Sequence, residues 1–87
     1  MKIKEGFMLR TVGGEHVVVA VGKAAPLLNG IIRLNDSGVE LWNLLKDGTE
    51  QENLVGFLRQ TYGISAEQAK QDVEHFLEPL RRVGCLE

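Results

Sequence analysis

The chain has little cysteine and no long hydrophobic run. Cys85 is its single cysteine, which excludes an intramolecular disulfide and fits a reducing compartment. No stretch approaches the roughly 20 consecutive apolar residues that a membrane-spanning helix needs. The first ten residues, MKIKEGFMLR, lack the apolar segment of a secretory signal. We therefore expect a cytoplasmic protein that does not enter a membrane.

An excess of positive charge is also missing. Lys and Arg total 10 against 12 Asp and Glu, which gives a net charge of −2. The first 45 residues are slightly basic, and the remaining 42 carry most of the acidic side chains. A protein that binds the phosphate backbone of a nucleic acid needs a clustered basic face, and the sequence contains no cluster of basic residues. We expect no nucleic acid among the partners.

No combination of residues is typical of catalysis or of metal binding. Cys85 stands in no nucleophile motif, and His16 and His75 are far apart in the sequence. Neither Gly13-Gly14 nor Asn29-Gly30 belongs to a phosphate-binding loop. We expect a non-enzymatic protein with no catalytic residue, no metal and no cofactor.

Three short strands are predicted in the first 34 residues. Residues 6–12 and 16–21 are apolar and rich in β-branched side chains, and Gly13-Gly14 between them permits a tight hairpin turn. Residues 22–30 are expected to form a loop. The segment 31–34, IIRL, is a short third strand in which Ile32 and Leu34 share one face.

Three helices are predicted after the strands. The first begins after Asn35 or Ser37 and is apolar on nearly every side, so it should be central, with Trp42 buried. Thr49 with Glu52 has the spacing of a capping box for the second helix. The second helix should end at Gly63.

The third helix begins at a further capping box, Ser65 with Gln68. Pro79 lacks a backbone N–H and should bend or restart the helix. An apolar stripe follows helical spacing through Ala69, Val73, Phe76, Leu77, Leu80 and Val83. The order βββααα predicts an α+β fold in a single domain, residues 1–87.

Two features have two interpretations each. The third strand and the third helix either both face the core, or they border an edge that accepts another chain. An open sheet edge is a hazard that proteins usually cover. An edge that stays open often serves strand addition by a peptide.

Short motifs in residues 31–87 resemble the PqqD-like family, the precursor-peptide recognition elements of ribosomally synthesised, modified peptide pathways. The motifs are LN-x-[ST]-G at 34–38, W-x-LL at 42–45, DGT at 47–49, YGI at 62–64, DV-x-x-FL at 72–77 and G-x-L at 84–86. The resemblance implies a winged-helix-like fold of three strands and three helices. Members serving pyrroloquinoline quinone synthesis carry a Tyr-Pro strand where this chain has NGIIRLN, which favours a relative serving another peptide.

The resemblance also implies a function. Such domains bind the leader of a precursor peptide as a strand and hold it for a modifying enzyme, often a radical S-adenosylmethionine protein. Carried over, the peptide-binding residues are Ile31, Ile32, Arg33 and Leu34 on the strand, and Asp72, Val73, Phe76, Leu77 and Leu80 on the third helix. The alternatives are a winged-helix DNA-binding regulator, with 65–82 as its recognition helix, and a structural or dimerisation module.

Overall fold

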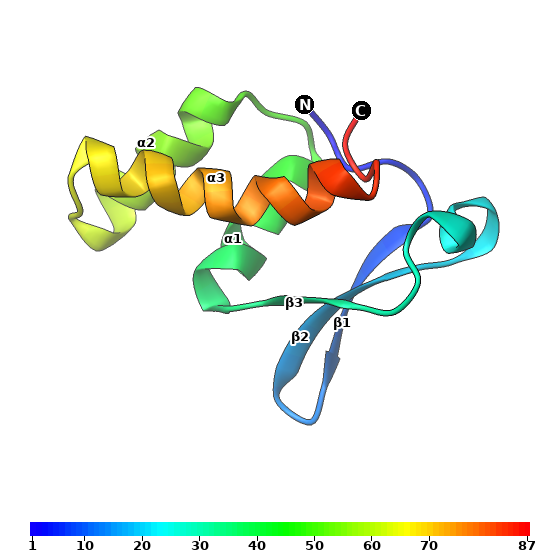
Figure 1. Ribbon diagram of the computed structural model, residues 1–87. Helices are drawn as coiled ribbons and strands as arrows, with labels where there is room; N and C mark the ends of the chain where they lie inside the picture. Colours follow the sequence, from blue (N-terminus) through cyan, green and yellow to red (C-terminus); the bar gives the residue numbers. More distant parts are fainter.

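The computed structural model describes all residues, 1–87. Its elements follow in the order β1 (Phe7–Val12), β2 (Glu15–Ala20), a 3₁₀ helix η1 (Gly22–Leu27), β3 (Ile32–Leu34), α1 (Asp36–Lys46), α2 (Gln51–Tyr62) and α3 (Ala66–Arg82). The three strands form one antiparallel sheet in the order β1-β2-β3. The three helices gather on one side of this sheet (Figure 1). The expected α+β, winged-helix-like arrangement is confirmed, with η1 as a short helix where we expected a loop.

The hairpin of β1 and β2 turns at Gly13-Gly14, as predicted. Both glycines have positive φ, +58° and +81°, which residues with a Cβ adopt only under strain. Val12 pairs with Glu15 directly across this two-residue loop. Such a closing pair is hydrogen-bonded, so the backbone groups of every second residue of β2 from His16 onward point away from β1 and toward β3.

The third strand is one residue shorter than predicted. It begins at Ile32, and Ile31 before it is 50% exposed. Ile32 and Leu34 pack against the hydrophobic core, whereas Arg33 between them is exposed. The predicted alternation of faces is therefore confirmed within the strand.

The structure shows which residues cap the three helices, including the choice between Asn35 and Ser37 that the sequence left open. Asn35 caps α1, because its side-chain oxygen Oδ1 accepts a 2.8 Å hydrogen bond from the N–H of Gly38. Ser65 caps α3 by accepting from the N–H of Gln68 at 3.1 Å. Thr49 does not cap α2, which begins at Gln51, so that prediction is wrong.

The Thr49 hydroxyl is occupied elsewhere. It accepts a hydrogen bond from Nδ2 of Asn53, and the backbone N–H of Thr49 donates to the carbonyl of Met1. These contacts hold Thr49 in the connection between α1 and α2, ahead of the helix.

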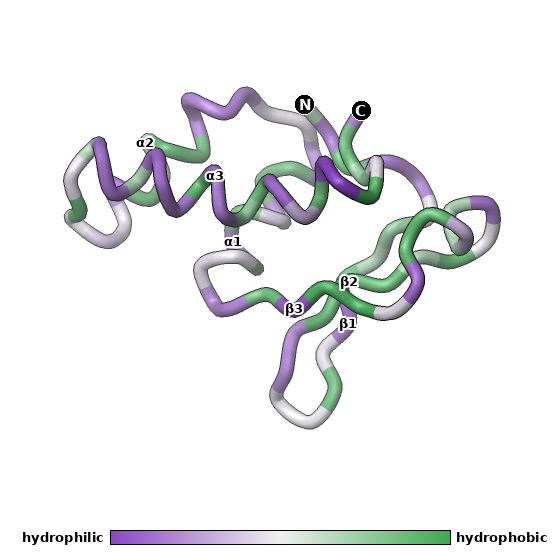
Figure 2. The backbone as a smooth tube through the Cα atoms, viewed as in Figure 1, coloured by the Kyte–Doolittle hydropathy of each residue, from purple (hydrophilic) through white to green (hydrophobic).

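The third helix runs without a restart through Pro79 to Arg82. Of the two effects expected of Pro79, a bend or a restart, the restart does not occur. The proline removes the N–H that would bond the carbonyl of His75, and His75 is exposed, so water can satisfy that carbonyl. Hydrophilic and hydrophobic residues alternate around α3, as expected for an amphipathic helix (Figure 2).

The core lies between the helices and the inner face of the sheet. Trp42 is 2% exposed, which confirms its predicted central place. The fully buried side chains around it come from all parts of the fold and include Val18, Leu41, Leu45, Leu54, Val73, Leu77, Leu80 and Cys85. The two ends of the chain meet beside this core, where Ile3 forms a β-bridge with Leu86 (Figure 1). None of the helices combines the length and the apolar composition needed to traverse a bilayer.

Candidate functional site: an open sheet edge beside a groove

One edge of β3 has no neighbouring strand. β3 pairs only with β2, in the register His16–Leu34 and Val18–Ile32. Since His16 and Val18 direct their backbone groups toward β3, Leu34 and Ile32 use theirs to bond β2. The N–H and C=O of Arg33 therefore face outward. No backbone bond outside the helices and strands engages them.

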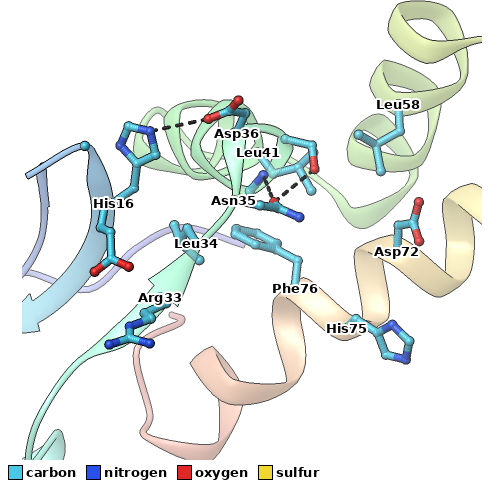
Figure 3. A pocket seen from close by; sticks show the side chains of 14 residues that line it. His16, Arg33, Leu34, Asn35, Asp36, Leu41, Leu58, Asp72, His75 and Phe76 are labelled. Carbon is cyan, nitrogen blue, oxygen red and sulfur yellow. Dashed lines mark hydrogen bonds and ion pairs between the residues drawn. The ribbon is translucent and has the colours of Figure 1, made fainter.

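A groove of about 760 Å³ lies next to this edge. The end of β3 and the start of α1 form one side of the groove, and α3 forms the other side (Figure 3). The hairpin contributes its β2 side, and α2 contributes one residue. The lining residues are Gly14, Glu15, His16, Arg33, Leu34, Asn35, Asp36, Ser37, Gly38, Leu41, Leu58, Asp72, His75 and Phe76.

Apolar side chains form the inner part of the groove. Phe76 projects from α3 toward Leu34 and Asn35, and Leu58 approaches from α2 (Figure 3). Phe76 is 8% exposed, so its ring belongs to the core on one side and to the groove on the other. An apolar side chain entering here would lose contact with water on several sides.

Polar groups surround that apolar interior. On α3, Asp72 is half-buried and accepts a 2.7 Å hydrogen bond from Nε2 of Gln68, and His75 is exposed. Opposite them, Nε2 of His16 lies 3.4 Å from Oδ1 of Asp36. The rim can therefore donate and accept hydrogen bonds around an inserted apolar group.

Of the predicted strand residues, Arg33 and Leu34 line the groove, and Ile32 packs inward beside them. Ile31 is exposed just before the strand. On α3, Asp72 and Phe76 line the groove. The other three predicted residues, Val73, Leu77 and Leu80, are each fully buried in the core. They belong to the same core cluster as Phe76. Their role as direct peptide contacts stays a prediction.

Sequence reasoning missed several lining residues. Asn35 lies in the LN-x-[ST]-G motif, which could have drawn attention to it. His16, Asp36, Leu58 and His75 come from four different elements and share no sequence pattern, so only the folded chain brings them together.

Two facts bear on metal ligands and on thiol chemistry in this chain. No three His, Cys, Asp or Glu side chains come close enough together to hold a metal ion. Cys85 is fully buried, and burial raises the pKa of its thiol to about 11. A thiol with that pKa is protonated near neutral pH and is a poor nucleophile.

The third helix does not present a basic face. Arg81 bonds Glu74 at 2.9 Å, and Arg82 bonds Glu78 at 2.7 Å. These pairs neutralise two of the three basic side chains of the helix. The arrangement does not favour the DNA-binding alternative.

Comparison with known proteins identifies the family. The family model described as Coenzyme PQQ synthesis protein D (PqqD) matches residues 15–86. The chain belongs to the PqqD family. The match includes β2, β3 and all three helices, and therefore the open edge and the groove. No curated protein matches the chain.

Two solved structures share the PqqD-family fold of this chain. TbiB1, in complex with the TbiA(beta) leader peptide, superposes with a TM-score of 0.76 at 23% identity, over 100% of this chain and 95% of TbiB1. Lasso peptide synthetase B1, complexed with the leader peptide, has a TM-score of 0.72 at 18% identity, over 95% of this chain and 92% of that protein. At these identities the likeness establishes the fold.

Proposed function

We propose that this chain binds the leader of a ribosomally made precursor peptide and presents it to a modifying enzyme, a radical S-adenosylmethionine protein or another peptide-modifying enzyme. The chain itself has no catalytic role in this proposal. Membership of the PqqD family supports it. So does the likeness to two proteins whose structures contain leader peptides.

The observation that carries the proposal is the position of the open β3 edge directly beside the groove. Arg33 offers one outward N–H and one outward C=O, which an extended peptide would satisfy by adding as a fourth strand. Alternate side chains of that peptide would point to the inner face of the sheet, where Leu34 and Phe76 line the groove. Backbone bonds then give affinity, and the groove gives selectivity.

The expected affinity follows from the size of the contact. Burying roughly 600 Å² of apolar surface would supply about 15 kcal/mol at about 25 cal/mol per Å². Ordering a flexible peptide opposes much of this gain. A dissociation constant in the micromolar to nanomolar range results.

The buried residues of α3 have a different role from the exposed ones. Val73, Leu77 and Leu80 fix the helix against the core, and this fixes the position of the Phe76 ring. Asp72 at the rim accepts from Gln68 and keeps further lone pairs for a donor on the peptide. A charged substitution at Leu77 would therefore unfold the chain, and Phe76 is the better position for testing binding.

The test is an amide chemical-shift titration. The probe is a 12-residue peptide selected from a random display library on the immobilised chain. The proposal predicts shifts concentrated in residues 30–35 and 69–80. Shifts centred on β1 or on α2, or a library that yields no binder tighter than about 100 μM, would contradict it.

A further inference from the structure

Arg33 has an unusual place on the sheet. Its backbone faces the open edge, and its side chain lies on the outer face, away from the helices. Across the three strands the register sets Arg10, Val17 and Arg33 in one row on that face. Val17 is buried between two exposed arginines, which fits burial under their aliphatic stems.

Neither arginine of this row has an acidic partner. The ion pairs of the chain involve Met1, His16, Arg81 and Arg82 as the positive groups. Glu15 lies diagonally from Arg33 on β2, and no ion pair joins the two. The guanidinium beside the open edge therefore remains available to another chain.

We infer that Arg33 selects an acidic residue in the bound peptide, at the one position that pairs with Arg33 when the peptide lies beside β3 as a strand. This inference rests on the proposed function. Paired residues of neighbouring strands place their side chains on the same face, within about 5.5 Å of each other. The side chain opposite Arg33 therefore lies on the outer face beside the guanidinium. A carboxylate there would complete a cross-strand ion pair.

The residues before and after that acidic position point to the opposite face. There they meet Ile32, Leu34 and the Phe76 ring. The recognised segment is consequently an extended tripeptide of the form apolar–acidic–apolar. The acidic residue is the middle one, because it pairs with Arg33 on the outer face and its two neighbours point to the inner face.

The test compares three forms of the chain: wild type, Arg33→Glu and Arg10→Glu. Arg10 is the matched control, because it occupies the same row and face but lies two strand spacings, about 10 Å, from β3. A peptide added beyond β3 would be about 15 Å from Arg10. This distance exceeds the screening length of about 8 Å at about 0.15 M salt, so the charge of Arg10 has little effect on the peptide. Each immobilised form is used to select binding peptides from the same random library of 12-residue peptides.

The inference predicts Asp or Glu between two apolar residues for the wild type and for Arg10→Glu, and Lys or Arg at the same position for Arg33→Glu. For the wild-type peptide, exchanging that Glu for Lys should weaken binding about 3- to 10-fold and should strengthen binding to Arg33→Glu by a similar factor. Retention of the acidic preference by Arg33→Glu would overturn the inference, and so would its inversion by Arg10→Glu. Selected peptides that show no charge preference would overturn it and leave the proposed function standing. Failure of every form to enrich a peptide would overturn both.

Discussion

The backbone N–H of Gly38 donates a 2.8 Å hydrogen bond to the side-chain oxygen Oδ1 of Asn35. This contact begins α1 directly where β3 ends, and it explains two positions of the LN-x-[ST]-G motif. A Cβ on residue 38 would lie 3.1 Å from Oδ1 of Asn35 and 3.3 Å from Cβ of Leu34. Glycine lets the helix approach the strand closely, and Asn35 satisfies one of the free N–H groups in the first turn of α1, that of Gly38.

Alanine substitutions should separate these two roles. Asn35→Ala removes the cap and should lower the free energy of unfolding by about 1 kcal/mol. Gly38→Ala should also destabilise, because Oδ1 of Asn35 is held by the cap and Cβ of Leu34 is fixed to the strand backbone, so neither can move away. Crowding of about 2 kcal/mol then exceeds the gain of about 1 kcal/mol in helix propensity. Urea unfolding measures both.

Gly56 provides the matched control for the glycine substitution. It lies within α2, and a Cβ there would meet nothing within 4 Å. Gly56→Ala should therefore stabilise the chain by about 0.5–1 kcal/mol. Equal effects at positions 38 and 56 would show that the approach of α1 to β3 is not tight.

Trp42 should be essential for folding. It is nearly fully buried at the centre of α1, in contact with the main cluster of the core. Trp42→Ala should reduce the free energy of unfolding by about 3–5 kcal/mol, a large part of the total for a chain of this size. Thermal melting followed by circular dichroism tests this, and melting close to that of the wild type would mean that the core is centred elsewhere.

Cys85 predicts a dependence of stability on alkaline pH. Burial raises the pKa of the folded thiol from 9.0 to about 11. Between those values the unfolded chain loses the thiol proton while the folded chain retains it, so the free energy of unfolding falls as pH rises. Denaturation of wild type and Cys85→Ala at pH 8 and pH 11 tests the difference. Identical pH dependence in the two would show that the thiol is not shielded from water.

Much of the fold follows from local sequence, because its turns and two of its caps rest on a few side chains. Gly13-Gly14 permits the positive φ angles that the tight turn requires, and Ser65 caps α3 where the spacing predicts. The start of α2 could not be predicted, since Thr49 is held by Met1 and Asn53, contacts that local spacing does not reveal.

The candidate site was predictable only in part for a related reason. The apolar stripe of α3 identifies a buried face, but it does not say which of its residues border the groove. Val73 and Leu77 lie under the rest of the fold, whereas Phe76, from the same stripe, reaches the groove. Residues one position apart on a helix differ by about 100° in direction, and only the packing of α1 and α2 decides which of those directions stays open.

The open edge predicts the effect of a proline. Arg33→Pro removes the outward N–H, leaves the pairing of β3 with β2 intact, and places a ring where the peptide would bond. Peptide affinity, measured by calorimetry, should fall at least 10-fold, with little change in melting temperature. The loss of one backbone bond, the steric block and the loss of the Arg33 guanidinium together account for this size.

Thr11 is the matched position on the other edge of the sheet. Its backbone groups face outward from β1, because Thr11 lies between the hydrogen-bonded positions Arg10 and Val12. Thr11→Pro should leave peptide affinity within about twofold of the wild type. An equal loss in both variants would locate the peptide away from β3.

The most direct measurement of strand addition is amide hydrogen exchange at Arg33. In the free chain the N–H of Arg33 faces solvent at the sheet edge, and so does that of Thr11. With the selected peptide at 100 times its dissociation constant, about 1% of the chain remains free. Exchange at Arg33 should then slow about 100-fold, while exchange at Thr11 stays unchanged. Exchange of the Arg33 amide at its free rate in the saturated complex would contradict the account.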